Sequence, residues 1–209
     1  MKMLELYCGT KSVSKAFDRI GWETYTVDWD PDFEPTRVMD ISKITYNDIL
    51  EICNGKPDVI WASPDCTTYS VAALGHHRYK AGNMLFPKTD YARFCDKANV
   101  HLSHILQGFD GLVFIENPRA GMRKMGFWYY PMYTVTYCQY GDFRMKPTDI
   151  WTNHPNPQFK PPCKQGMSCH IAAPRGSQTG SQGMATKDSA KIPEQLADHV
   201  AKICRDYYE

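Results

Sequence analysis

The chain has 209 residues, of which 43% are hydrophobic and 22% charged, and its formal net charge is +1. This composition is typical of a globular protein that buries one substantial core, and we expect a single domain. No run of 18 apolar residues and no apolar N-terminal segment of the signal-peptide type occurs, so we expect no membrane span and a cytoplasmic protein. The eight cysteines are expected to be reduced thiols rather than a disulfide framework.

The charge is unevenly distributed along the chain. Residues 119–175 contain eight Lys/Arg and two Asp/Glu, whereas residues 1–118 contain 12 Lys/Arg and 16 Asp/Glu. A net charge of about +6 over residues 119–175 is typical of a surface that faces phosphates. The alternative is a solvated basic face that has no partner.

The first 30 residues predict a strand, a turn, a helix and a second strand. The strands are expected over residues 2–7 and 23–27, and the helix over residues 13–20, where Gly21 ends it. Cys8-Gly9-Thr10-Lys11-Ser12 forms the turn, and Asp28 ends the second strand. This layout is typical of a nucleotide-binding half, in which the turn meets a carboxylate or phosphate and the acid binds ribose. With one glycine the pattern is weak by itself.

The next strand leads to a candidate nucleophile. Residues 56–62 predict a strand that is buried on both faces and ends at Ser63-Pro64, because proline cannot continue a central strand. Cys66 follows in a turn at the carboxyl end of that strand, where ligands bind in open α/β sheets. A buried structural cysteine is the alternative. Residues 73–90, which include His76 and His77, are predicted to form a mobile loop.

A carboxylate is expected near Cys66. Residues 111–115 form a wholly apolar strand that ends at Glu116-Asn117-Pro118, so Glu116 should reach the same sheet edge as Cys66; a capping carboxylate is the alternative. A hairpin is predicted from strands at 132–137 and 149–152. Helices are predicted over residues 44–53 and 192–207, and over residues 91–106 with Phe94, Ala98, Leu102 and Ile105 on one face.

Residues 153–190 are rich in Pro, Gly, Ser, Gln and Thr, and they predict an extended surface segment. Within it, Cys163, Cys169 and His170 carry side chains that can bind zinc. The spacing C-x5-C-H lacks a second pair of ligands, however, and a closed zinc site needs four. We therefore predict no metal site.

These motifs resemble, in order and over nearly the whole chain, those of the DNA (cytosine-5) methyltransferases, most closely the small phage-type members. Ser63-Pro64-Asp65-Cys66 resembles the family's proline-proline-cysteine turn, and Glu116-Asn117-Pro118 resembles its glutamate-asparagine motif. These two matches are the specific ones. The weaker matches are Leu4–Gly9, Asp28, Asp40-Ile41, and Asp142-x-Arg144-x-Lys146 in the place of glutamine-x-arginine-x-arginine.

The resemblance implies a Rossmann-like α/β fold with a mostly parallel sheet flanked by helices. It also implies that S-adenosylmethionine donates a methyl group to C5 of cytosine in DNA, through a covalent adduct of Cys66. Glu116 would hold the base and stabilise charge, and Arg144 would contact its O2 side. The cofactor would be bound by Leu6, Tyr7, Cys8, Gly9, Thr10, Asp28, Trp29, Asp40, Ile41 and Pro64. DNA would be bound by Arg119, Arg123, Lys124, Lys146, Lys164 and Arg175.

Three departures from the family pattern affect these expectations. Lys11 stands where the first motif usually has a glycine, and Asp65 replaces a proline, placing a charge that should oppose formation of the Cys66 thiolate. Residues 152–192 provide only about 40 residues where larger members insert a target-recognition domain, which predicts a short or relaxed sequence context.

Two alternatives remain open. One is a related transferase that acts on RNA or a nucleotide, or that moves a modified group. The other is a catalytically inactive nucleic-acid-binding relative. The sequence does not indicate a protein partner.

Overall fold

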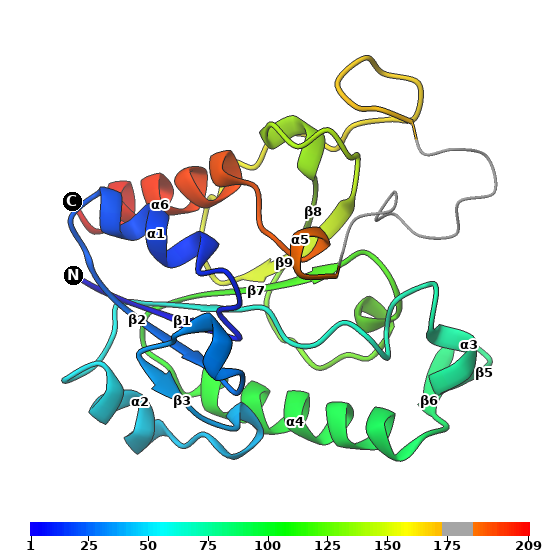
Figure 1. Ribbon diagram of the computed structural model, residues 1–209, viewed down its shortest axis with the longest axis horizontal. Coiled ribbons are helices and arrows are strands. Elements are labelled where there is room, and N and C mark those ends of the chain that lie inside the picture. Colours follow the sequence, from blue (N-terminus) through cyan, green and yellow to red (C-terminus); the bar gives the residue numbers. More distant parts are fainter. Residues whose placement is uncertain (173–185) are drawn as a thin grey trace.

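The computed structural model describes residues 1–172 and 186–209, and within them seven strands form one central sheet (Figure 1). The strand order is β3-β2-β1-β4-β7-β9-β8. The first five strands in that order run parallel, whereas β9 runs antiparallel to β7 and β8. The strands are β1 (Lys2–Leu6), β2 (Glu23–Asp28), β3 (Arg37–Val38), β4 (Val59–Ala62), β7 (Leu112–Pro118), β8 (Met132–Thr136) and β9 (Pro147–Thr152).

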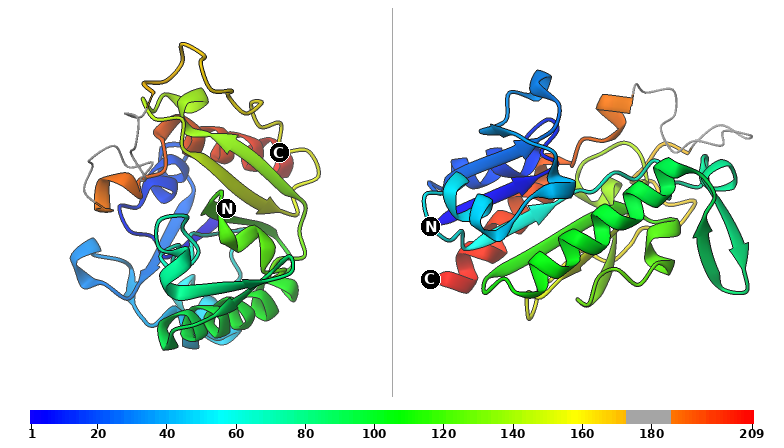
Figure 2. Two further views of the ribbon diagram at one scale, coloured as in Figure 1. Left: turned by 90° about the vertical axis from the view of Figure 1, so that its right-hand side faces the viewer. Right: turned by 90° about the horizontal axis from the view of Figure 1, so that it is seen from below.

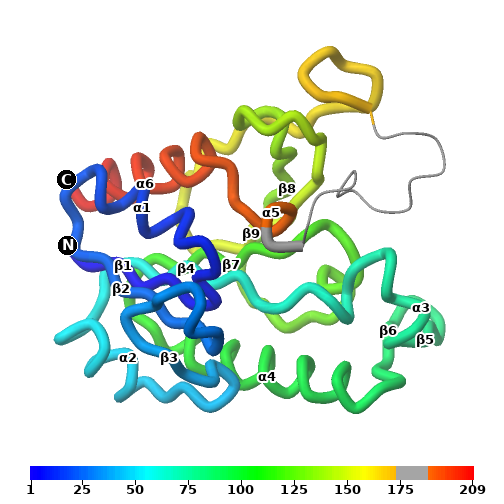
Figure 3. The backbone as a smooth tube through the Cα atoms, in the orientation of Figure 1, coloured from blue at the N-terminus to red at the C-terminus, as the bar shows by residue number. Residues whose placement is uncertain are grey.

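Helices connect the parallel strands, because a parallel neighbour can be reached only through a crossover. The chain passes from β1 to β2 through α1 (Ser12–Arg19), from β3 to β4 through α2 (Tyr46–Ile52), and from β4 to β7 through α4 (Asp90–Gln107). The last helix, α6 (Glu194–Tyr208), lies beside α1, and both termini lie at the end of the sheet opposite α3 (Figure 3). The carboxyl ends of the parallel strands point away from the termini.

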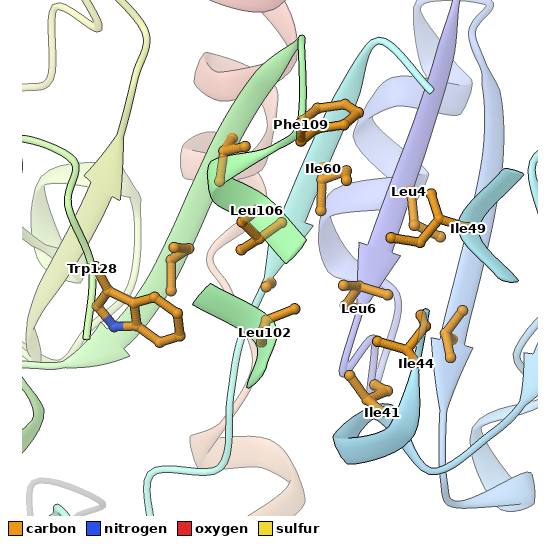
Figure 4. Close-up of a cluster of buried hydrophobic side chains, with 14 of the residues drawn as sticks. Leu4, Leu6, Ile41, Ile44, Ile49, Ile60, Leu102, Leu106, Phe109 and Trp128 are labelled. Carbon is orange, nitrogen blue, oxygen red and sulfur yellow. The ribbon is translucent and has the colours of Figure 1, made fainter. Parts of the chain in front are cut away.

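Both faces of the sheet are covered, which explains why its central strands are continuous apolar runs. On one face, Phe17 of α1 and Leu196 of α6 are fully buried in a cluster that includes Trp61 of β4. On the other face, Leu102 of α4 packs in a cluster with Leu6 of β1 (Figure 4). Short 3-10 turns complete the chain: η1 (Pro31–Phe33), η2 (Ile41–Lys43), η3 (Gly121–Lys124) and η4 (Tyr137–Tyr140).

Helix α4 buries Ala98 and Leu102 as expected, but not the whole of the predicted apolar face. It begins after Thr89, whose hydroxyl accepts a hydrogen bond from the backbone N–H of Ala92 (3.2 Å), as an N-cap should. The buried face contains Cys95 and Leu106, whereas Phe94 is 50% exposed and Ile105 is only partly buried. The apolar stripe read from the sequence is thus rotated, because Phe94 faces a cavity described below rather than the core.

The expected loop at residues 73–90 is instead ordered structure. It contains α3 (Leu74–His77) and an antiparallel hairpin of β5 (Arg78–Ala81) and β6 (Met84–Pro87), which projects beyond the sheet (Figure 2). A two-residue turn with Gly82 at φ +59° joins the strands. The buried Arg78 anchors the hairpin, because it pairs with Asp96 of α4 (Nη2–Oδ1, 2.7 Å) and lies over the Tyr69 ring. The polar composition of this stretch favoured a loop, and no sequence pattern indicated that Arg78 would be buried.

The predicted Rossmann-like fold with a mostly parallel sheet is confirmed by the sheet order and directions. The predicted hairpin of β8 and β9 and the closing helix are also present. Residues 153–172 form no helix or strand, and α5 (Thr186–Ser189) is a single short turn. In the two described ranges, no helix is both long and apolar enough to cross a membrane.

Candidate active site

Two cavities lie where the parallel strands end, and both are lined by Tyr7, Asp65 and Thr67. The cysteine cavity has a volume of about 260 Å³ and is also lined by Glu5, Cys8, Gly9, Thr10, Ser12, Phe33, Ser63, Pro64, Cys66, Glu116, Pro118, Lys146, Ala190, Lys191 and Ile192. The aromatic cavity has a volume of about 770 Å³ and is also lined by Trp29, Asp40, Ile41, Ser42, Tyr91, Phe94, Cys95, Ala98 and Asn99.

The turn that carries Cys66 is held from two sides. The side-chain amide of Asn117, in β7, donates a hydrogen bond to the carbonyl of Pro64 (Nδ2–O, 2.8 Å). On the other side, Asp65 accepts hydrogen bonds from the backbone N–H of Thr67 (2.7 Å) and from the hydroxyl of Tyr91 in α4. The half-buried Cys66 is therefore fixed between the end of β4 and its neighbours.

The Cys66 thiol is protonated at neutral pH when no ligand is bound. Burial and, to a smaller extent, the negative charges of Glu116 and Asp65 raise its pKa to about 11, although the charge of Lys146 opposes that rise. Only the thiolate attacks carbon, so Cys66 must lose its proton during the reaction rather than be ionised beforehand. The expectation that Asp65 opposes thiolate formation agrees with the direction of its effect on this pKa.

Glu116 is buried at the end of β7 and lines the cysteine cavity. Burial raises its pKa, while the charge of Lys146 and hydrogen bonds from Tyr137 and Ser63 oppose that rise. The Tyr137 hydroxyl donates a hydrogen bond to Glu116 (Oη–Oε1, 3.1 Å). A carboxyl group with a raised pKa can hold a proton and donate it to a ligand.

Lys146 also lines the cysteine cavity, together with Cys66 and Glu116. From the sequence we listed it among the residues expected to bind DNA. Burial lowers its pKa, and the charge of Glu116 opposes that shift. Its ammonium group donates to the carbonyl of Ser189 (2.8 Å) and lies 4.5 Å from the centre of the Tyr137 ring.

Arg144 is not among the residues that line the cysteine cavity. Its guanidinium forms a two-point ion pair with Asp142 (Nε–Oδ1, 3.0 Å; Nη2–Oδ2, 2.5 Å) and also donates to the carbonyl of Ser189. It lines a separate depression with Gly141 and Asp142. In this structure the guanidinium of Arg144 is paired with Asp142, and Lys146, two residues further along the chain, lines the cysteine cavity instead.

Two acids hold the first turn, which contributes Cys8, Gly9 and Thr10 to the cysteine cavity. Glu5 accepts the backbone N–H groups of Val13 (3.4 Å) and Ser14 (2.8 Å) at the start of α1. Burial raises the pKa of Glu5 to about 7, although those hydrogen bonds oppose the rise. The first donors of α1 are therefore already paired, and fewer remain for a ligand than the sequence suggested.

Asp28 also serves this turn. It is buried, and its carboxylate accepts the N–H of Gly9 (2.9 Å) and of Asp30 (3.1 Å). It is not among the residues that line either cavity. Lys11, where the family has a glycine, adopts φ +57° and so occupies the left-handed region that favours glycine, while its ammonium group donates to the carbonyl of Glu34.

The remaining expected cofactor residues fall into two groups. Trp29, Asp40 and Ile41 line the aromatic cavity, Tyr7 lines both cavities, and Pro64 lines the cysteine cavity. Leu6, in contrast, is fully buried in the core under the turn.

Sequence reasoning missed the ring pair of Tyr91 and Phe94, stacked with centroids 6.5 Å apart on α4. The two aromatic residues are three positions apart on a predicted helix, and this spacing could have indicated that their rings lie side by side.

The residues expected to bind DNA also separate. Arg119, Lys124 and Lys164 are exposed on the surface. Arg123 instead pairs with the buried Asp149 through two bonds (Nε–Oδ2, 2.9 Å; Nη2–Oδ1, 2.6 Å), so its guanidinium is committed inside the protein. Arg175 lies outside the described residues.

Comparison with known proteins supplies a relative along the whole chain. The chain is 27% identical, over 98% of its length and 100% of the relative's, to a protein of Frog virus 3 (isolate Goorha) described as a probable DNA (cytosine-5)-methyltransferase. No family model matches the sequence. The resemblance to DNA (cytosine-5) methyltransferases predicted from the motifs is confirmed by this similarity.

Solved structures agree on the fold. A methyltransferase of Entamoeba histolytica superimposes with a TM-score of 0.50 and 15% identity, covering 73% of this chain and 52% of that one. A putative DNA modification methyltransferase encoded within a prophage of E. coli gives a TM-score of 0.52 and 13% identity, covering 73% and 46%. The chain thus has a methyltransferase fold and spans about half the length of these two structures.

Proposed function

We propose that this chain is an enzyme that transfers a methyl group from S-adenosylmethionine to C5 of cytosine in DNA, through a covalent bond to Cys66. The observation that carries the proposal is the cysteine cavity, which is lined by a thiol, a buried carboxyl group and a half-buried ammonium group. The similarity to a probable DNA (cytosine-5)-methyltransferase over the whole chain supports the same reaction.

The aromatic cavity suits the nucleoside part of S-adenosylmethionine. It is large enough for a nucleoside and is lined by the rings of Trp29, Tyr91 and Phe94, on which a purine can stack. Asp40, at its wall, can accept hydrogen bonds from the ligand's amine or hydroxyl groups. Tyr7, shared with the cysteine cavity, lies where the ligand would pass from one cavity to the other. When bound, S-adenosylmethionine supplies an electrophilic methyl group on a cationic sulfur.

Cys66 would supply the nucleophile that cytosine needs. C5 of cytosine is a weak nucleophile, and addition of the Cys66 thiolate to C6 gives C5 the electron density of an enamine. Once C5 carries the methyl group, loss of the C5 proton expels the thiolate and restores the aromatic base. C5 and C6 are stacked within a duplex, so the target base must be flipped out or already single-stranded.

Glu116 and Lys146 would control charge during that addition. A protonated Glu116 can donate to N3 of the base, which withdraws electrons from C6 as the thiolate adds, and the raised pKa of Glu116 favours that form. Lys146 lowers the pKa of Cys66, and its ammonium group can meet O2 of a base in the cavity that it lines. The two residues thus replace the expected pair of Glu116 and Arg144.

DNA would be bound mainly through its phosphates, and only a short base sequence would be recognised. The exposed Arg119, Lys124 and Lys164 can each contact a phosphate, a contact that carries no sequence information. We propose a single methyltransferase domain in which the irregular segment at about 152–192 stands in place of a target-recognition domain. Its described part, residues 153–172, has no helix or strand on which to present a row of base-reading side chains. We expect a context of two or three bases and binding that weakens with salt.

The test is transfer of radiolabelled methyl from S-adenosylmethionine to DNA, followed by digestion and identification of the labelled nucleoside. We expect 5-methyldeoxycytidine from the native chain and background counts from Cys66→Ser. The variant Cys53→Ala, which changes a buried cysteine at the end of α2, should remain active and serves as the matched control.

RNA and free cytidine nucleotides are assayed in parallel as acceptors. Label that enters only RNA or a nucleotide, or that enters DNA at a position other than C5, would contradict the proposed substrate. Retention of full activity by Cys66→Ser would contradict the covalent mechanism.

A further inference from the structure

A second cluster of cysteines lies away from the cysteine cavity. Cys138 in η4 and Cys163, Cys169 and His170 in the irregular segment bring one ligand atom each to within 4.8 Å of one another. The measured separations are 3.0 Å for Cys163 Sγ–Cys169 Sγ, 3.6 Å for Cys169 Sγ–Cys138 Sγ, 3.4 Å for Cys163 Sγ–His170 Nδ1 and 3.8 Å for Cys169 Sγ–His170 Nδ1. The sequence supplied three of these ligands, and the fold brings in Cys138 as the fourth.

The separations agree with a tetrahedral metal site. With metal–sulfur bonds of about 2.3 Å and metal–nitrogen bonds of about 2.0 Å, tetrahedral ligands stand about 3.8 Å apart for two sulfurs and about 3.5 Å for sulfur and nitrogen. Three of the four measured separations lie close to these values, and the 3.0 Å pair is shorter. A disulfide would need a sulfur–sulfur bond of about 2.05 Å, which this pair does not form.

We propose that Cys138, Cys163, Cys169 and His170 bind one structural Zn²⁺ ion. Three thiolates and one imidazole form a closed four-ligand set that is typical of structural zinc and leaves no position for a catalytic water. Each cysteine binds as a thiolate, so zinc binding releases its thiol proton to solvent. This site is independent of the proposed methyl transfer, because none of its four ligands lines the cysteine or aromatic cavity.

The ion would fasten the irregular segment to the part of the fold that carries Lys146. Cys138 lies in η4, directly before the loop that leads to Lys146. Hydrogen bonds support the same attachment on both sides of the cluster: the Cys163 N–H donates to Thr136 Oγ1 (2.8 Å), and the Ile171 N–H donates to the carbonyl of Phe143 (2.8 Å). Residues 163–171 have no helix or strand of their own, so a metal cross-link explains how they hold one position.

The first experiment measures metal content by mass spectrometry on protein purified without chelator and then reconstituted with Zn²⁺. We expect one zinc ion per chain. Replacement by Co²⁺ should give the visible absorption of a tetrahedral site with thiolate ligands. Cys138→Ser is the decisive variant and should lose zinc, whereas Cys53→Ala should retain it. If Cys138→Ser fails to fold, Cys138→His, which keeps a metal ligand, should fold and bind zinc.

The second experiment uses trypsin, which can cleave after the exposed Lys164, directly beside Cys163. Chelation should accelerate cleavage at this lysine by at least tenfold, and added Zn²⁺ should restore protection. Three results would overturn the proposal: native protein without zinc after reconstitution, zinc binding that survives Cys138→Ser, or a mass two daltons low that reveals a Cys163–Cys169 disulfide. Iron in place of zinc would overturn it too.

Discussion

The charged side chains on the two sides of the sheet edge that carries Cys66 have different partners. On the side of β1, β2 and β4, the carboxylates of Glu5, Asp28 and Asp65 accept backbone N–H groups and so hold the two turns that line the cavity. On the side of β7 to β9, the guanidinium groups of Arg123 and Arg144 are paired with aspartates. Cys66 lies between these acidic and basic sides.

The comparison teaches that most of the charges near this site shape the protein rather than contact a ligand. From the sequence we assigned Asp28 to the cofactor, Arg123 to DNA and Arg144 to the target base. In the structure the acids hold turns and the arginines hold acids, and Lys146 is the predicted cation that reaches the cavity. The following changes test that division, from the largest expected effect to the smallest.

Arg123→Met should destabilise the fold. It removes the partner of Asp149, which is fully buried, and an unpaired buried carboxylate costs about 3–5 kcal/mol. Urea unfolding monitored by fluorescence measures the loss. Lys124→Met, at the exposed neighbouring position, should change the free energy of unfolding by less than about 0.5 kcal/mol. Equal effects of the two changes would show that Arg123 is not committed inside the protein.

Glu5→Gln should remove a pH dependence of stability. The unfolded Glu5 releases its proton near pH 4.5 and the folded one near 7, so ionisation destabilises the folded state. Native stability should therefore fall as the pH rises from 4.5 to 7, by about 3 kcal/mol for this group. Denaturant unfolding at pH 5 and pH 8 should show a smaller fall in Glu5→Gln than in the native chain. Parallel curves for the two proteins would contradict the assignment.

Asp28→Ala should weaken S-adenosylmethionine binding by about 1–3 kcal/mol, the range for a lost hydrogen bond to a charged group. The reason is indirect, since the N–H of Gly9 loses its acceptor and the turn loses its fixed position. Calorimetric titration measures the change, with the exposed Asp32→Ala as the control. Unchanged affinity in Asp28→Ala would remove this acid from the account of the site.

Lys146→Gln and Asp65→Asn should shift the reactivity of Cys66 in opposite directions. Loss of the cation raises the pKa of the thiol, and loss of the neighbouring carboxylate lowers it. The rate of alkylation by iodoacetamide, followed against pH with peptide mapping of Cys66, should therefore rise at higher pH in Lys146→Gln and at lower pH in Asp65→Asn. Shifts of the same sign in both variants would contradict the assigned charges.

Much of the fold followed from local patterns. Apolar runs that end at Pro64 and at Glu116 indicated buried parallel strands, and this order placed Cys66 and Glu116 at one sheet edge, where both line one cavity. The β5–β6 hairpin could not be predicted in this way. Its stability depends on the contact of Arg78 with Asp96, 18 residues away, and a polar sequence gives no periodic signal for such a contact.

The site itself was only partly predictable, for the same reason. Neighbours in sequence showed which residues lie at the strand ends, but not which charges pair. Arg144 turns to Asp142, two residues before it, and thereby leaves the cavity to Lys146. Cys138 lies 25 residues before Cys163, and only the fold of η4 against the irregular segment brings their sulfurs into one cluster.

The central claim is that Cys66 forms the covalent bond, and trapping tests it most directly. A cytosine-containing oligonucleotide with 5-fluorocytosine at the target base cannot lose a proton from C5, so the adduct cannot break down after methyl transfer. Incubation with native protein and S-adenosylmethionine, followed by proteolysis and mass spectrometry, should find the oligonucleotide on the peptide that contains Cys66. An adduct on any other cysteine, or none while native DNA is methylated, would contradict the account.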